Sequence, residues 1–133
     1  MVLNFFRGEG MSHIVKINLS LNINDKQAVL QALTKMGVKV SSEHKVSDYY
    51  GKVTTVSDGL ISFNIKGRWF TLDKNGNLIG DTYGLGELPI NTIKFAVLLA
   101  ATMKNGGRVK KVEMIGDGWT ADVEDTMEEK FAA

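Results

Sequence analysis

Hydrophobic positions repeat with two different periods along this chain, and the change of period predicts where strands give way to helices. Between Ile14 and Ile23 the apolar residues recur at every second position, which is typical of a half-buried strand. A helix is then expected to begin at Asn24, a good N-cap residue, with Gln27 three positions on as in a capping box. The apolar residues that follow have helical spacing and end before a glycine suited to the left-handed position past a helix: Val29, Ala32, Leu33, Met36 and Gly37.

Short alternating segments follow this first helix. A brief strand is expected over residues 38–43, and the pattern weakens between residues 44 and 59, where turn residues are frequent. Alternation returns over residues 61–65, 70–72 and 78–81, with turn residues between the three segments. This pattern predicts a meander of three antiparallel strands.

The most apolar segment, Ile90–Lys104, is apolar almost all round and therefore predicts a buried helix. Pro89 before it and the glycines after Asn105 are start and stop signals in the expected order. Residues 108–125 then read as two strands about a Gly-Asp-Gly turn. Helices and strands do not alternate regularly, so we predict an α+β fold, a largely antiparallel sheet with two helices packed on one face.

Length and composition are those of a single folded domain. The chain has 133 residues, of which 44% are hydrophobic and 23% charged, and a chain of this size buries enough surface for one core. We divide it into an N-terminal extension (residues 1–10), one α+β domain (residues 11–125) and a charged C-terminal tail (residues 126–133). The first residues are too short an apolar run for a signal peptide, and no segment approaches the roughly 18–20 apolar residues of a membrane helix. We therefore expect a cytoplasmic protein without membrane partners.

The charge balance weakens the case for a nucleic-acid partner. Sixteen basic and 15 acidic residues give a net charge of +1, which provides no chain-wide attraction to a polyanion. The charge is uneven, because the segment from Ala121 onward has five acidic residues and one basic residue, a charge of −4 that leaves +5 for the rest of the chain. A modest basic patch is thus allowed but not indicated.

Several chemistries lack the residues that they need. The chain has no cysteine, and its two histidines, His13 and His44, have no neighbour at a metal-ligand spacing. The segment from Asp73 resembles a calcium loop at first, but Leu78 and Gly84 stand where such a loop needs glycine and a bidentate glutamate. We therefore expect a hairpin turn there, and no metal and no cofactor.

One stretch, from Gly80 to the start of the buried helix, is the candidate site. Glycine amides before a helix are natural anion donors, and an arginine and a tryptophan on the preceding strand offer a phosphate contact and a stacking surface. The glycine spacing matches no phosphate-binding motif, and Asp81 and Glu87 would repel a phosphate. A simple strand-to-helix connection therefore explains the stretch better than a phosphate site does. The candidate ligand-binding residues are Arg68, Trp69, Asp81, Tyr83, Gly84 and Gly86.

Two segments carry a family resemblance. The segment beginning Met11-Ser12-His13-Ile14 and ending near Gly37, and the later Gly76–Gly84, resemble the hypothetical chloroplast reading frame family (domain of unknown function 1257), found in plastids, cyanobacteria and phages. Val38 departs from that family, in which an aromatic residue usually follows the helix-end glycine. The resemblance implies that residues 1–10 precede the usual start of the family's members. It also implies a phage or cyanobacterial-type origin, with the host cytoplasm as the location of a phage-encoded chain. It carries no catalytic residues over.

Three functions follow as hypotheses. The first is a small non-catalytic binding or regulatory protein acting through protein contacts, as a homo-oligomer or with another protein partner. The second is a protein that binds or sequesters a small ligand such as a nucleotide. The third, and the one with least support, is a hydrolase using paired carboxylates among Asp81, Glu87 and Asp117, since nothing in the sequence shows that any two of them meet.

Overall fold

Backbone pairing among residues 13–125, the part of the chain that the computed structural model describes, forms three separate antiparallel sheets. The main sheet has five strands in the order β1-β7-β6-β5-β2: β1 (Val15–Asn18), β7 (Asn77–Gly80), β6 (Arg68–Asp73), β5 (Gly59–Ile65) and β2 (Val40–Ser41). Two hairpins pair only within themselves, one formed by β3 (Lys45–Ser47) and β4 (Val53–Thr55), the other by β8 (Gly107–Ile115) and β9 (Gly118–Asp125). The helices are α1 (Lys26–Lys35) and α2 (Leu88–Lys104).

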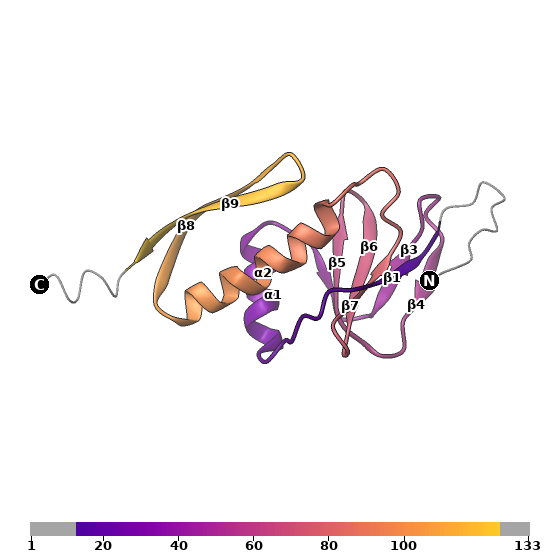
Figure 1. Cartoon of the computed structure of the whole chain (residues 1–133), viewed down its shortest axis with the longest axis horizontal. Coiled ribbons are helices and arrows are strands. Elements are labelled where there is room, and N and C mark those ends of the chain that lie inside the picture. Colours follow the sequence, from indigo (N-terminus) through magenta and orange to yellow (C-terminus); the bar gives the residue numbers. More distant parts are fainter. Residues whose placement is uncertain (1–12, 126–133) are drawn as a thin grey trace, which may run out of the picture.

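These elements stack in layers (Figure 1). Both helices lie on one side of the main sheet, the β3–β4 hairpin lies on the other side, and the β8–β9 hairpin covers α2 from outside. The predicted α+β class, the two helices on one face and the antiparallel meander, which is β5-β6-β7, are confirmed. The predicted extension and tail, residues 1–10 and 126–133, lie outside the described residues.

The core fills the space between the main sheet and the helices. Phe63 and Phe70 stack with ring centroids 6.0 Å apart, and both side chains are fully buried. Alternate residues of the three meander strands join them from the sheet, and the inward faces of both helices close the core. Its fully buried members include Ile61, Leu72, Leu78, Leu33, Ala32, Ile93 and Ala96.

Helix α1 begins one residue later than predicted. Asp25, and not Asn24, is the N-cap, and its carboxylate accepts the Ala28 N–H at 3.0 Å. The second carboxylate oxygen receives the Lys104 ammonium at 2.9 Å, which joins the start of α1 to the end of α2. This hydrogen bond, with that of Ala28, lowers the pKa of Asp25. The predicted buried positions and the left-handed Gly37, with φ of 81°, are confirmed.

Helix α2 is apolar all round because it is covered on two sides. One side faces the core, and the other receives the β8–β9 hairpin, whose Trp119 stacks on Phe95 with centroids 6.3 Å apart. The Trp119 indole N–H donates to the Thr92 hydroxyl at 2.8 Å. Since Thr92 is itself fully buried, this hydrogen bond attaches the hairpin to a buried residue of α2.

The first strand is shorter than predicted. Ladder pairing along β1 ends where Asn18 meets Asn77, the first residue of β7, and one more hydrogen bond follows, from the Leu19 N–H to the Gly76 carbonyl at 3.1 Å. The alternation that predicted a strand to Ile23 is nevertheless real, since Leu19 and Leu21 pack against the core while their neighbours are exposed. The chain therefore keeps the burial pattern of a strand beyond the end of its hydrogen bonding.

The segment from Asp73 is a hairpin turn, as predicted. The Asp73 carboxylate accepts the backbone N–H groups of Asn75 and Asn77, both at 2.9 Å, and the Asn77 side-chain amide at 3.2 Å. Burial raises the pKa of Asp73, but these hydrogen bonds outweigh burial and leave the pKa lowered. The oxygens that a calcium ion would need are thus bound to the turn itself.

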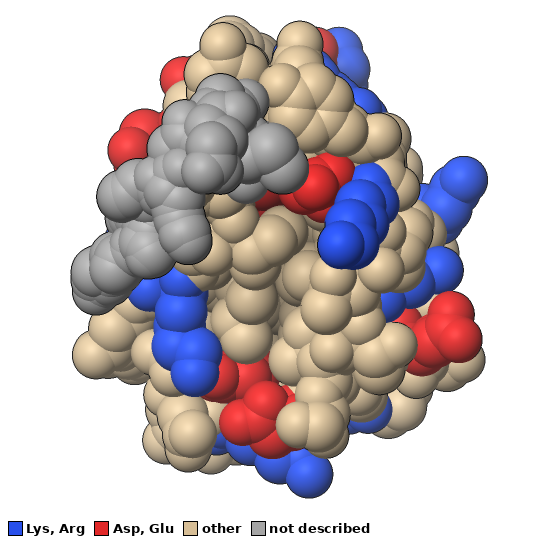
Figure 2. All heavy atoms as spheres, turned by 90° about the vertical axis from the view of Figure 1, so that its right-hand side faces the viewer, with Lys and Arg blue, Asp and Glu red and all other residues tan. Residues whose placement is uncertain are grey.

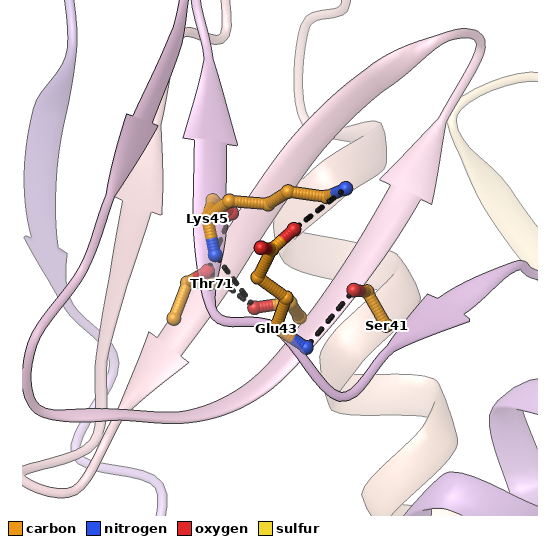
Figure 3. Close-up of polar contacts among 5 residues, drawn as sticks. Ser41, Glu43, Lys45 and Thr71 are labelled. Atoms are coloured by element: carbon orange, nitrogen blue, oxygen red, sulfur yellow. Dashed lines mark hydrogen bonds and ion pairs between the residues drawn. The ribbon is translucent and has the colours of Figure 1, made fainter.

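A ring of hydrogen bonds fixes strand β3 on the outer face of the sheet (Figure 3). The Lys45 N–H donates to the Ser62 hydroxyl at 3.2 Å, and the Thr71 hydroxyl donates to the Lys45 carbonyl at 2.7 Å. The two hydroxyls are 2.6 Å apart, and since Thr71 donates to Lys45, Ser62 must donate to Thr71. Each group then donates once and accepts once, so two fully buried hydroxyls are satisfied.

Replacing Thr71 by valine is expected to lower the free energy of unfolding by about 1–3 kcal/mol, because the ring opens and the Lys45 carbonyl and the Ser62 hydroxyl lose their partners. Urea unfolding monitored by circular dichroism measures the change. The same replacement at Thr54, an exposed residue of β4, is the control and should shift stability by less than about 0.5 kcal/mol. Equal effects at the two positions would contradict the ring.

Candidate functional site

Asp81 follows the last residue of β7 and is 1% exposed. One carboxylate oxygen accepts the Tyr49 N–H at 2.9 Å, and the other accepts the Tyr83 N–H at 3.0 Å. The first donor lies in the β3–β4 turn and the second in the connection to α2. Asp81 therefore joins the connection to α2 to a turn that lies 32 residues earlier in the sequence, and both oxygens of its carboxylate are engaged by backbone groups of the same chain.

Arg68, at the start of β6, holds the same connection from a second direction. Its guanidinium donates to the Asp81 carbonyl at 2.7 Å and to the Tyr83 carbonyl at 2.6 Å. The guanidinium carbon also lies 5.3 Å from the centroid of the Tyr49 ring, within the range of a cation–π contact. Arg68 and Asp81 thus fix both sides of the turn by complementary donors and acceptors.

These anchors place three tyrosines side by side, which we name the tyrosine patch: Tyr49, Tyr50 and Tyr83. The ring of Tyr49 meets that of Tyr83 edge to face with centroids 4.9 Å apart, and that of Tyr50 at 5.3 Å. Their exposed fractions are 50%, 66% and 65% for Tyr49, Tyr50 and Tyr83. They are all the tyrosines of the chain.

The turn that carries two of these tyrosines is built by Asp48. One of its carboxylate oxygens accepts the N–H groups of Tyr50 at 3.0 Å and of Lys52 at 2.8 Å. Gly51 supplies a positive φ of 91° inside this turn. The side chains of Tyr49 and Tyr50 are therefore displayed on a loop whose backbone is tied both locally and, through Asp81, to the main sheet.

The two candidate glycines have backbone roles. Gly84 and Gly86 have φ of 77° and 58°, a conformation that favours glycine. Gly84 is open, whereas a Cβ atom at Gly86 would lie 2.8 Å from a carboxylate oxygen of Asp117, from the β8–β9 turn. A carboxylate in that place disfavours a phosphate at Gly86.

Trp69 stands apart from the tyrosine patch in its contacts. Its backbone N–H donates to the Ser47 hydroxyl at 2.8 Å, and the Lys45 ammonium lies 4.6 Å from the centroid of its ring. The structure thus brings Arg68, Asp81 and Tyr83 together, while it gives Trp69 a lysine as its neighbour. Sequence reasoning missed Tyr49 and Tyr50, whose only signal was an Asp-Tyr-Tyr-Gly turn in a weakly patterned region.

The three carboxylates of the hydrolase hypothesis have different surroundings. Asp81 is buried and bonded to amides, while Glu87 and Asp117 are exposed. Among residues 13–125, no group of three or more histidine, aspartate or glutamate side chains is placed to hold a metal ion. These positions give no support to shared acid and base chemistry.

The surface charges are mixed on the face that carries β1, β3 and β4. Figure 2 shows lysine and arginine side chains interspersed with acidic ones on this face, between larger uncharged areas. Such a surface lacks the single-sign field of a nucleic-acid site. In the described part of the chain, no helix has both the length and the apolar character that crossing a membrane requires.

Comparison of the chain with protein families, curated proteins and solved structures gave no match.

Proposed function

We propose that this chain is a small non-catalytic binding protein that acts through protein contacts, and that the tyrosine patch is its contact surface. The observation that supports this is the grouping of all three tyrosines, each at least half exposed, in edge-to-face contact. Tyrosine gives a large, amphipathic contact area at a low cost in side-chain entropy, and it is enriched among the residues that dominate binding energies.

The way the patch is built adds a second reason. Arg68 and Asp81 together make four hydrogen bonds to the backbone of the loops that carry the tyrosines. Loops that are already ordered lose less conformational entropy when a partner binds. A merely structural role would not require the rings themselves to face solvent. We place this function in the cytoplasm, in the host if a phage encodes the chain, and the resemblance to the chloroplast reading frame family stays a prediction.

The test is a double variant, Tyr50→Ser with Tyr83→Ser, in which both anchors remain. The wild-type chain is expected to form a homo-oligomer or to retain a protein partner, and the variant to bind that partner about 30-fold more weakly, the equivalent of a 2 kcal/mol hot spot. Light scattering measures self-association, and pull-down followed by titration measures the partner. The matched control is Leu98→Ser on α2, because Leu98 is 64% exposed and lies outside the patch.

Two results would overturn the proposal. One is a wild-type chain that is strictly monomeric and recovers no partner. The other is a double variant that binds as tightly as Leu98→Ser does. Circular dichroism of the three proteins establishes that the loss of binding is not a loss of folding.

The nucleotide-binding hypothesis remains a prediction with a separate test. Its polar residues are engaged inside the chain, since Arg68 donates to two carbonyls and Asp81 accepts two amides. Of the other candidate residues, Tyr83 and Gly84 are exposed, and Trp69 is half-buried with the Lys45 ammonium over its ring. A nucleotide at 100 times its dissociation constant would add about 2.7 kcal/mol of stability, so a thermal-shift panel without any shift removes this hypothesis.

A further inference from the structure

The N-terminal end of β1 lies beside the anchor of the tyrosine patch. Val15 pairs with Gly80, the residue immediately before Asp81. Because the two strands are antiparallel, the chain upstream of Val15 is directed the way that β7 continues, toward Asp81 and Tyr83. Residues 1–12 therefore join the described structure next to the patch, two residues before β1 begins.

The sequence of this segment suits an aromatic surface. It contains adjacent Phe5 and Phe6, with Val2 and Leu3 before them and Arg7 after them. From Val15 back to Phe6 is nine residues, which span up to about 30 Å when extended, so the phenylalanines reach the patch with chain to spare. Phenylalanine and tyrosine rings attract one another edge to face, and an arginine binds a tyrosine face.

We propose that residues 1–12 occupy the tyrosine patch of their own chain, with Phe5 and Phe6 packed on the tyrosine rings. Attachment at His13 gives the segment an effective concentration in the millimolar range, so that even weak aromatic contacts compete with a free partner. The segment then acts as an internal competitor at the contact surface. That regulatory meaning rests on the proposed function, whereas the occupancy itself does not.

The composition of the chain allows a direct test. Because the only tyrosines are those of the patch, 3-fluorotyrosine gives fluorine NMR signals from the patch alone. Because the chain has no cysteine, Asn4→Cys provides a single site for a nitroxide label next to Phe5. The nitroxide radical broadens the NMR signals of nearby nuclei. The fluorotyrosine signals are therefore expected to be weaker than in the same sample after the radical has been reduced. Unchanged intensities would overturn the proposal.

A matched variant tests whether the two phenylalanines are needed, and a mixed sample tests whether the segment occupies the patch of its own chain. In the labelled chain that also carries Phe5→Ser and Phe6→Ser, the lost intensity is expected to return, and a loss that persists would overturn the role of the two rings. In a mixture of labelled, fluorine-free chain with unlabelled, fluorinated chain, no loss is expected. The mixture is measured at a concentration at which light scattering finds only monomer, or, if the chain does not dissociate, against the same mixture with Phe5→Ser and Phe6→Ser in the labelled chain. A loss in the mixture that depends on the two phenylalanines would show that the segment binds a second copy, which overturns the intramolecular proposal.

The rate of tyrosine nitration by tetranitromethane gives an independent readout in the full-length chain. Nitration mapped by mass spectrometry is expected to be faster at the patch in the Phe5→Ser, Phe6→Ser chain than in the wild type, and equal rates would contradict the occupancy. Neither measurement uses a partner protein. Occupancy can therefore be demonstrated even if the binding test of the proposed function fails, and the reverse also holds.

Discussion

Alanine in place of Asp81 is expected to lower the free energy of unfolding by about 3 kcal/mol and to release the tyrosine patch. The carboxylate accepts two backbone N–H groups, and hydrogen bonds to a charged group contribute about 1.5–3 kcal/mol each. The side chain is also almost fully buried, so water compensates little for its loss. Both loops lose their common attachment in the same substitution.

Two measurements check this expectation. Urea unfolding gives the stability change, and amide hydrogen exchange at Tyr49 and Tyr83 is expected to accelerate, since both N–H groups lose their acceptor. Asp122→Ala, at an exposed aspartate of β9, is the control and should change stability by less than about 0.5 kcal/mol. An Asp81→Ala protein as stable as this control, with unchanged exchange, would show that the anchor is unimportant.

Alanine in place of Gly80 is expected to destabilise the protein by about 3 kcal/mol, the upper part of the range for overpacking a core. A Cβ atom at this position would lie 2.2 Å from Cδ2 of Phe70, whose ring is fully buried and stacked on Phe63. Phe70 is fully buried in the same core cluster as Phe63, so the ring could move away only by displacing its core neighbours. The clash must therefore be relieved by a movement of β6 or β7.

A double-mutant cycle separates this clash from other effects of removing a glycine. Phe70→Leu, which shortens the facing side chain, is expected to make Gly80→Ala less costly than it is alone, with a coupling of at least about 1 kcal/mol. Gly84→Ala is the matched control: nothing lies near its Cβ position, but its φ of 77° costs an alanine about 1–2 kcal/mol. No coupling is expected between Gly84→Ala and Phe70→Leu. A coupling of equal size in both cycles would refute the contact.

Much of the fold is predictable because the signals are local. The meander could be predicted because apolar and polar residues alternate in three segments that are separated by turn residues. The turn after Asp73 could be predicted because the residues that form it, including the Asp73 carboxylate, are adjacent in the sequence. Helix α2 is predictable because a long segment that is apolar almost all round is typical of a buried helix, and two of its sides are indeed covered although Leu98 is exposed. Its start at Leu88, two residues before the predicted Ile90, shows that proline is accepted within the first turn of a helix.

What could not be predicted depends on contacts between distant segments. All three residues of strand β4 are exposed, so its sequence has no burial pattern to detect. The site of β3 on the sheet is set by Ser62 and Thr71, two hydroxyl residues on different strands whose meeting no spacing reveals. The candidate site shows the same limit, because Asp81 meets Tyr49 across 32 residues. Sequence indicated the connection around Asp81 but not the second loop that completes the patch.

The β8–β9 hairpin gives the molecule two levels of cooperativity. Strand pairing within residues 13–125 connects β8 and β9 only to each other, and the hairpin rests on α2 through Trp119 and its neighbours. It can therefore open as a separate folding unit while the five-stranded sheet stays intact. Each opening would uncover the outer side of an apolar helix. The rate of aggregation should then follow the stability of this hairpin rather than that of the whole domain.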